Sequence, residues 1–195
     1  MNLEVLENVK KEALENHVPI IMDDTLKVIS EYLADLKPKK ILEIGTAVGY
    51  SASQFIKLAG EDAELDTIEL DEERAKQAIE NIKNIGLEKN INVIIGNAVE
   101  ILPDLKGPYD MIFIDANKGK YPVFLQEALR MSHKGTIIFA DNVLYKGYVL
   151  GDYNKHKQRT AVRHLREYLA ESISNEKLDT QVSTVGDGLA ISIVK

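Results

Sequence analysis

The chain opens with two stretches in which apolar residues recur every three or four positions. The first stretch contains Leu3, Leu6, Val9 and Ala13, and the second contains Leu26, Ile29, Leu33 and Leu36. This spacing places apolar side chains on one face of a helix. The pattern therefore predicts two amphipathic helices, with a break near Pro19.

From Lys39 onward the pattern changes to short apolar runs separated by longer helical stretches. Such alternation is typical of βαβ units that build a parallel sheet. The predicted strands are Lys40–Ile44, Glu64–Glu69, Asn92–Ile95, Met111–Ile114 and Thr136–Ala140. The predicted helices between them are Tyr50–Leu58, Glu72–Ile85 and Tyr121–Met131.

The C-terminal part predicts one more helix, about Ala161–Ile173, and two further strands, Gln181–Val185 and Leu189–Val194. Only Gly186-Asp187-Gly188 joins these two strands, and so short a connection requires an antiparallel pair. The predicted fold is α/β and Rossmann-like, with a seven-stranded, mostly parallel sheet that ends in an antiparallel C-terminal hairpin.

The length of 195 residues predicts a single domain over 1–195. Hydrophobic residues make up 45% and charged residues 28%, the balance of a globular protein. The first twenty residues interleave acids with apolar residues, so we expect neither a signal peptide nor a membrane span. Without cysteine there is no disulfide framework or thiolate metal site, and we expect a cytoplasmic protein. The net charge of -7 argues against nucleic-acid binding over the whole surface and leaves room for a local basic patch.

The run from Ile41 to Ser51 leads from a buried strand through a turn with Gly45 and Gly49 into a helix. Such a turn lets a ligand approach the backbone and the free N–H groups of the helix start. Ala47 and Tyr50 stand where a dinucleotide motif has its second and third glycines, which disfavours a pyrophosphate. The glycines alone could simply end a strand. Glu69, which ends the next strand and can accept hydrogen bonds from ribose hydroxyls, favours an adenosine-containing ligand.

Acidic and amide side chains follow the fourth and fifth strands: Asp115 after the fourth, Asp141 and Asn142 after the fifth. The carboxyl ends of neighbouring parallel strands meet at one edge, so these side chains can converge. Two carboxylates and an amide oxygen suit Mg²⁺, Mn²⁺ or Ca²⁺. The simpler alternative is that each Asp caps a helix. Lys118, three residues after Asp115, would lie beside the same edge and could act as a general base.

Four motifs, ILEIGTAVGYSA, TIELD, IFIDANKGKY and ADNVLYKG, resemble the metal-dependent O-methyltransferases of the catechol and caffeoyl-coenzyme A type. The similarity runs from about Glu43 to the final hairpin. It implies the class I methyltransferase fold, S-adenosylmethionine as methyl donor and Mg²⁺ or another divalent cation. The resemblance implies metal ligands at Asp115, Asp141 and Asn142 and a base at Lys118. It also implies cofactor contacts at Glu43, Gly45, Thr46, Tyr50, Ser51, Glu69, Ala98 and Asp115.

One departure from this family bears on the substrate. Catechol methyltransferases carry a glutamate after the D-G-L of the last hairpin, whereas Leu189 is followed here by Ala190. The motifs VGDGLAIS, DNVLYKG and HVPIIM instead resemble a bacterial subgroup that methylates 5-hydroxyuridine in transfer RNA. That resemblance implies conversion of 5-hydroxyuridine in the anticodon loop to 5-methoxyuridine.

A basic segment between Gly151 and Arg166 agrees with an RNA acceptor. Its five cations, against the single acid Asp152, are Lys155, Lys157, Arg159, Arg163 and Arg166. Such a concentration can contact phosphates, although a solvated helix face is the simpler interpretation. The alternatives are a methyltransferase of small phenols and a non-catalytic adenosine-nucleotide-binding module. We also expect a homodimer, with residues 1–37 forming part of a lid or of the dimer contact.

Overall fold

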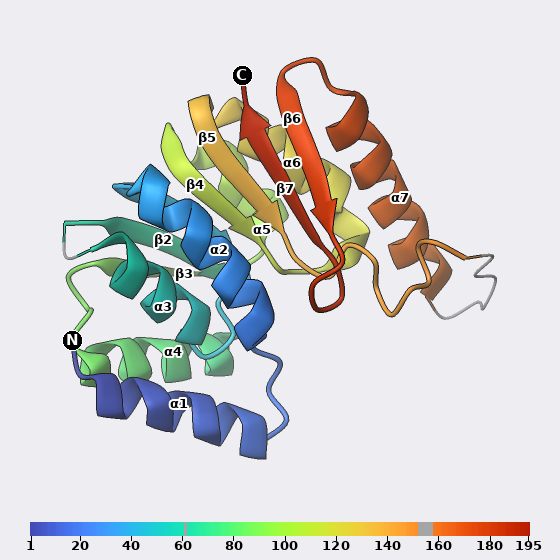
Figure 1. Ribbon diagram of the computed structural model, residues 1–195. Helices are drawn as coiled ribbons and strands as arrows, with labels where there is room; N and C mark the ends of the chain where they lie inside the picture. Colours follow the sequence, from blue (N-terminus) through green and yellow to red (C-terminus); the bar gives the residue numbers. More distant parts are fainter. Residues whose placement is uncertain (61, 152–157) are drawn as a thin grey trace. The chain divides into compact units, whose positions relative to one another are not determined.

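The N-terminal unit, Met1–Ile101, is built on three parallel strands (Figure 1). They are β1 (Lys40–Ile44), β2 (Glu64–Glu69) and β3 (Ile91–Ile95), in the order β3-β2-β1. The computed structural model describes residues 1–60, 62–151 and 158–195. β1 is buried along most of its length, as expected for a parallel strand whose two faces are both covered.

Five helices belong to this unit: α1 (Leu3–Glu15), α2 (Asp23–Leu36), α3 (Tyr50–Ala59), α4 (Glu72–Ile85) and the short α5 (Ala98–Ile101). α1 begins where the Asn2 side chain accepts hydrogen bonds from two backbone N–H groups, and Asp71 caps α4 in the same way. α1 packs on α3 and α4 with the predicted apolar face, whose buried members are Leu6, Val9 and Ala13. The helical spacing thus predicts this face correctly.

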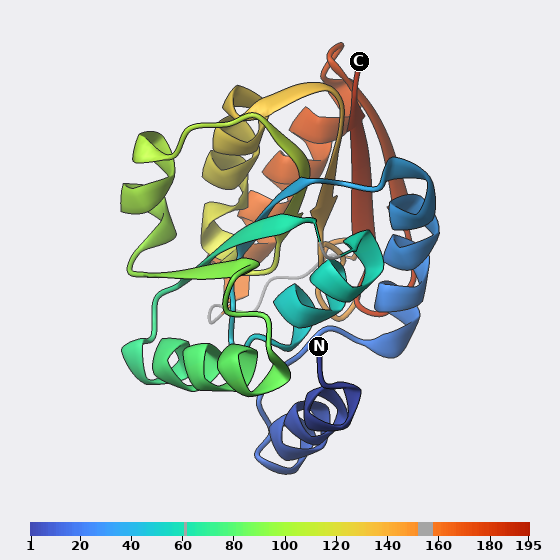
Figure 2. The ribbon, with the colours of Figure 1, turned by 90° about the vertical axis from the view of Figure 1, so that its left-hand side faces the viewer.

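The C-terminal unit, Leu102–Lys195, contains a mixed sheet of four strands. They are β4 (Tyr109–Ile114), β5 (Ser132–Ala140), β6 (Leu178–Ser183) and β7 (Leu189–Val194), in the order β4-β5-β7-β6. β4 and β5 are parallel, while β7 is antiparallel to both β5 and β6. The helices α6 (Tyr121–Arg130) and α7 (Arg159–Ser174) pack side by side (Figure 2). Two 3-10 turns, η1 (Leu102–Asp104) and η2 (Lys118–Lys120), precede β4 and α6.

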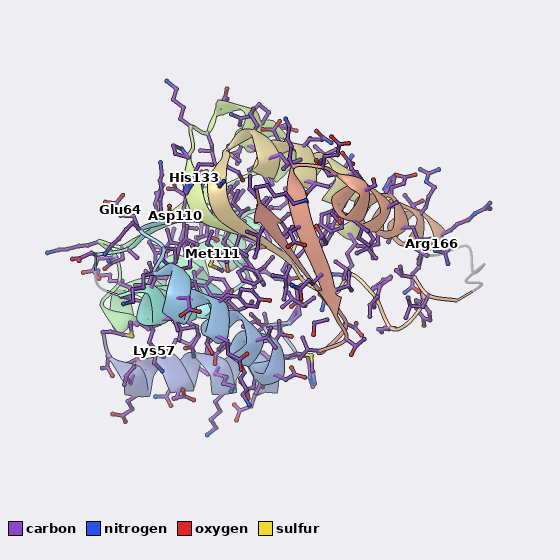
Figure 3. The ribbon with its side chains drawn as sticks, turned by 45° about the horizontal axis from the view of Figure 1, so that its top comes forward. Lys57, Glu64, Asp110, Met111, His133 and Arg166 are labelled. Carbon is purple, nitrogen blue, oxygen red and sulfur yellow. The ribbon has the colours of Figure 1, made fainter. Side chains whose placement is uncertain are left out.

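A polar contact joins the starts of β4 and β5 at the protein surface. The Nε2 atom of His133 lies 2.8 Å from Oδ1 of Asp110 (Figure 3). Its Nδ1 atom lies 2.8 Å from the carbonyl oxygen of Lys134. β5 begins at Ser132, four residues before the start of the predicted strand.

The predicted fold class is confirmed: the strands are mostly parallel, seven are described, and the last two form an antiparallel hairpin. The predicted bounds of β6 were wrong, because the strand covers Leu178–Ser183 rather than Gln181–Val185. Ser183 already pairs with Leu189, and the carbonyl of Val185 accepts from the N–H of Gly188 inside the turn. The single domain over 1–195 stays a prediction. Among the helices of the described ranges, none has the length and apolar character needed to cross a membrane.

Candidate functional site

The turn after β1 has a backbone that few residue types adopt. Gly45, Ala47 and Gly49 all have positive φ angles, of 109°, 47° and 79°. Two features favour glycine at position 49: its positive φ angle, and the Ile82 side chain, which would lie 3.2 Å from a Cβ atom there. The turn leads directly into α3, so the N–H groups at the start of this helix lie at its end.

Glu69, at the end of β2, is hydrogen-bonded to this turn. Its Oε2 accepts from the N–H of Ala47 at 2.8 Å, and its Oε1 accepts from the N–H of Asp71 at 2.9 Å. Each carboxylate oxygen can accept more than one hydrogen bond, so both keep capacity for ligand hydroxyls. This oriented acid beside a glycine turn fits the ribose of an adenosine-containing ligand.

A buried network of hydroxyl groups and one carboxylate lies behind the turn. Glu43 is 0% exposed, and its two oxygens accept from Ser51 Oγ and Thr67 Oγ1, both at 2.6 Å. The hydroxyls of Thr67 and Thr46 are also 2.6 Å apart. Thr67 is absent from the sequence-based predictions. The signal that identifies it is the parallel register, in which Glu43 and Thr67 are partners.

Tyr50 and Ala98 complete the predicted cofactor residues of this unit. Tyr50 is 2% exposed, and its hydroxyl accepts a hydrogen bond from Nε2 of Gln54 at 2.9 Å. Burial raises the pKa of the Tyr50 phenol. Ala98 is half-buried and is the first residue of α5, directly after Gly96 and Asn97. The structure therefore gathers Gly45, Thr46, Tyr50 and Ser51 in one turn and helix start, hydrogen-bonded to β2.

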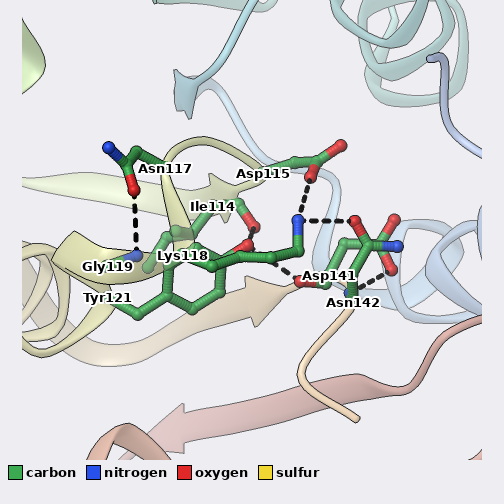
Figure 4. A network of polar contacts seen from close by, with 8 residues as sticks. All are labelled: Ile114, Asp115, Asn117, Lys118, Gly119, Tyr121, Asp141 and Asn142. Carbon is green, nitrogen blue, oxygen red and sulfur yellow. Dashed lines mark hydrogen bonds and ion pairs between the residues drawn. The ribbon is translucent and has the colours of Figure 1, made fainter. Parts of the chain in front are cut away.

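In the C-terminal unit, the ends of β4 and β5 bring the other candidate residues together (Figure 4). The N–H of Asp141 donates to the carbonyl of Ile114, which aligns the two strand ends. Lys118 Nζ donates to Asn142 Oδ1 at 3.0 Å and lies 3.8 Å from Asp115 Oδ1. The four residues predicted from the strand ends thus lie in one cluster.

Burial raises the pKa of both carboxyl groups of this cluster, and like charge adds to the effect at Asp141. Burial raises the pKa of Asp115, against the lowering effect of Lys118. Burial and, next, the charge of Asp115 raise the pKa of Asp141 to about 7. A nearby dication would favour the charged form of both groups.

The donor set also suits such an ion. No three His, Cys, Asp or Glu side chains gather as a metal-binding group in the residues the structure describes. The cluster instead offers two carboxylates and the amide oxygen of Asn142, which is a hard-oxygen set. Asn142 has a φ of 56°, a left-handed conformation that asparagine tolerates better than most residues. The Nζ atom of Lys118 lies close to the side-chain oxygens of Asn142 and Asp115. The chain thus places a basic group of its own beside the proposed ion site.

Lys118 also lies near two aromatic rings. Its Nζ is 6.0 Å from the ring centre of Tyr121 and 5.9 Å from that of Tyr145. Tyr145 belongs to the segment after Asn142 and has a φ of 43°. The final hairpin holds this segment: the N–H of Lys146 donates to Asp187 Oδ1, and a Cβ on Gly188 would collide with the side chain of Leu144.

The predicted basic patch is only partly described. Lys155 and Lys157 lie outside the described residues. Arg159 begins α7, and Arg163 Nε lies 3.5 Å from Oε1 of Glu167. Arg166 donates to the carbonyl oxygens of Val149 at 3.0 Å, Tyr148 at 3.3 Å and Gly151. Its guanidinium is thus hydrogen-bonded to the chain itself, and in the described part the predicted patch rests on Arg159 and Arg163.

Comparison with known proteins agrees with this chemistry. A family profile described as O-methyltransferase matches residues 2–195. A catechol O-methyltransferase of Niastella koreensis is 39% identical over 175 residues, covering 85% of this chain and 78% of that protein. A caffeoyl-CoA O-methyltransferase of Stellaria longipes is 29% identical, covering 92% and 79%. The O-methyltransferase TomG of Streptomyces achromogenes, solved in complex with S-adenosylmethionine, aligns with a TM-score of 0.88 at 27% identity over 98% of this chain and 90% of TomG. The chain belongs to the O-methyltransferase family and is an S-adenosylmethionine-dependent O-methyltransferase.

Proposed function

We propose that this O-methyltransferase depends on a divalent cation and methylates a hydroxyl group that has a second oxygen on the adjacent carbon. The observation that carries the proposal is the cluster of Asp115, Asp141 and Asn142 around the Lys118 ammonium. Asp115, Asp141 and Asn142 would hold the dication with their side-chain oxygens. Bound there, it would lower the pKa of a hydroxyl of the acceptor. Lys118, whose Nζ lies beside Asn142 and Asp115, is the proposed base for the hydroxyl proton.

S-adenosylmethionine is assigned in this proposal to the turn Gly45–Ser51 together with Glu69. The carboxylate of Glu69 accepts from the ribose hydroxyls, while its bonds to the N–H groups of Ala47 and Asp71 hold it in place. Ala47 and Tyr50 stand where a dinucleotide-binding motif has glycines, which suits a ligand without pyrophosphate. The sulfonium supplies the methyl group.

For the acceptor we propose 5-hydroxyuridine in the anticodon loop of transfer RNA. Its 5-hydroxyl and C4 carbonyl oxygen form a vicinal pair that can chelate one metal ion. A base in a flexible loop can be splayed out without melting a duplex. Arg159 and the exposed Arg163, on α7, supply positive charge for phosphate contacts in a chain of net charge -7.

A small phenol with vicinal hydroxyls is the second candidate acceptor. The relatives at 39% and 29% identity are a catechol and a caffeoyl-CoA O-methyltransferase, which favours it. Against catechol itself stands Ala190, which is 0% exposed and pairs with Ala140 in the sheet. Alanine offers no carboxylate for the second catechol hydroxyl.

The two acceptors are separated by replacing Arg159 and Arg163 together with Gln. We expect weaker binding of hydroxyuridine-containing transfer RNA and a shallower salt dependence, with methylation of a free small phenol unchanged. The matched control is Arg74→Gln with Lys83→Gln, which removes two exposed positive charges from α4. Equal loss on both acceptors, or no methylation of the RNA by the wild type, favours the small phenol.

The metal requirement is tested independently of the acceptor. Excess chelator should abolish turnover on either acceptor, and Mg²⁺ should restore it. Full activity in the presence of chelator contradicts the metal-dependent mechanism, whichever acceptor is right.

A further inference from the structure

We propose that Thr67 is a positioning residue of the cofactor site, because its hydroxyl ties the buried Glu43 carboxylate to the turn that receives S-adenosylmethionine. The inference rests on the proposed assignment of the cofactor to the turn Gly45–Ser51. It concerns a residue two positions before Glu69 in β2 that does not belong to the turn itself.

The strand register brings Thr67 to this place. Glu43 and Thr67 are partners in the parallel pairing of β1 with β2, so their side chains leave the same face of the sheet. Thr67 and Glu43 are both 0% exposed, and Thr46 is 1% exposed. Water is thus excluded from these groups, and their polar atoms depend on one another.

The proton positions follow from the inventory of donors. Separations of 2.6 Å are those of hydroxyl groups that donate to a carboxylate, which can only accept. Thr67 has a single hydroxyl proton and gives it to Glu43. Thr46 must then donate to Thr67, across another 2.6 Å. The result is a directed chain from Thr46 through Thr67 to Glu43, which Ser51 reaches from the other side.

The hydrogen bonds from Thr46 through Thr67 to Glu43 link β2 to the turn, beside a second side-chain contact from the same strand. β2 holds two successive turn residues: Thr67 bonds to the side chain of Thr46, and Glu69 bonds to the N–H of Ala47. Ala47 has a φ of 47°, and such a conformation persists only where the surroundings enforce it. Loss of the Thr67 hydroxyl leaves Thr46 without this acceptor and Glu43 without one donor. The turn can relieve both by moving, and the cofactor contacts move with it.

The test compares Thr67→Val, Thr67→Ser and Thr136→Val in cofactor binding measured by calorimetry. Thr136 is the matched control: it is 0% exposed, its hydroxyl donates to the carbonyl of Tyr109 at 2.7 Å, and it lies in β5 of the other unit. We expect Thr67→Val to raise the Kd for S-adenosylmethionine about tenfold, equivalent to ~1.4 kcal/mol. Thr67→Ser, which keeps the hydroxyl, should stay within about twofold of the wild type, a change worth under ~0.5 kcal/mol.

A general loss of stability would not produce this pattern. Thr136→Val should lower the melting temperature comparably and leave the Kd for S-adenosylmethionine unchanged. At saturating cofactor, Thr67→Val should recover most of kcat, because the defect lies in binding. Thr67→Cys keeps the volume and a weak donor, so it serves if Thr67→Val does not fold, and an intermediate Kd is expected.

Three results overturn the proposal. The first is wild-type binding by Thr67→Val or, if that variant does not fold, by Thr67→Cys. The second is that Thr67→Ser binds as weakly as Thr67→Val, and the third is that Thr136→Val raises the Kd for S-adenosylmethionine as much as Thr67→Val does. Glu69→Ala separates this failure from a wrong cofactor site. If Glu69→Ala binds weakly and Thr67→Val does not, only the role of Thr67 is refuted. If neither change affects binding, the assignment of the cofactor to this turn is refuted as well.

Discussion

The two candidate sites, one in each unit, differ in how their carboxylates are satisfied. In the N-terminal unit, the oxygens of Glu43 accept from two hydroxyls and those of Glu69 from two backbone N–H groups. In the C-terminal unit, Asp115 and Asp141 repel one another, and burial raises the pKa of each. The first site is preorganised by neutral donors before any ligand binds. The second retains electrostatic repulsion that the proposed cation would relieve.

The largest effect is expected from removing one negative charge from the cluster of Asp115 and Asp141, which tests whether the two sites differ in this way. Asp141→Asn keeps the shape but withdraws a negatively charged ligand from the proposed metal site. We expect the turnover rate to fall more than roughly 100-fold, since even changes in groups that only orient metal ligands cost 10–100-fold. S-adenosylmethionine affinity should stay close to that of the wild type, because the N-terminal unit supplies the proposed donor contacts. Steady-state kinetics and calorimetry measure the two effects.

Asp110→Asn is the control for that experiment. Asp110 is also an aspartate of the C-terminal unit, but it pairs with His133 at the surface. It should leave turnover unchanged. If Asp141→Asn retained full activity, the cluster would not be a catalytic metal site.

The next largest effect is expected from the other site. Glu69→Ala removes the acceptor of two backbone N–H groups and the proposed ribose contact. We expect S-adenosylmethionine binding to weaken by about 1.5–3 kcal/mol, the usual cost of losing a hydrogen bond to a charged group. Calorimetry measures it. Glu64→Ala, at the exposed start of the same strand, should bind the cofactor normally, and a folded Glu69→Ala protein with wild-type affinity would contradict the assignment.

These contrasts also explain how far the sequence could lead. Gly45, Gly49 and Glu69 were predictable because glycines and strand ends are local signals, and Asp115 and Asp141 because parallel strands end at one edge. Thr67 was not predictable, because the sequence around it, Leu65–Glu69, has only the features of an ordinary strand.

The same limit explains the charged segment and the last hairpin. Arg166 looks like one more cation of a basic stretch, and only the fold reveals that it donates to three carbonyl groups. Likewise, the start of β6 depends on the pairing of Leu178 with Val194, which no local pattern specifies. Long-range hydrogen bonds, rather than propensities, decide these features.

A smaller effect is expected from the Arg166 guanidinium, which is hydrogen-bonded to the segment Tyr148–Gly151. Arg166→Met should lower the free energy of unfolding by about 1–2 kcal/mol, because the carbonyl of the buried Val149 and those of Tyr148 and Gly151 lose this donor. For a chain of this size that corresponds to a melting temperature lower by about 2–8 °C. Arg163→Met removes an exposed ion pair with Glu167 and should change stability by less than about 0.5 kcal/mol. Equal melting temperatures for the two variants would contradict the role of Arg166.

The smallest effect concerns a pair far simpler than either site, His133 with Asp110. The hydrogen bond that His133 donates to Asp110 and, next, its hydrogen bond to the Lys134 carbonyl raise the pKa of His133 above its ordinary 6.5. A raised pKa in the folded state means that the contribution to stability is fully present below about pH 6.5 and is lost as the pH rises through the higher, folded-state pKa. The side chains are 42% and 30% exposed, so solvent limits this contribution to less than about 1 kcal/mol. Denaturant unfolding of the wild type and of His133→Gln should therefore differ more at pH 6 than at pH 9, and added salt should shrink the difference. Subtracting one protein from the other cancels groups that titrate in both, such as Asp141. A difference that stayed constant across this pH range would mean that the imidazolium charge does not stabilise the junction of β4 and β5.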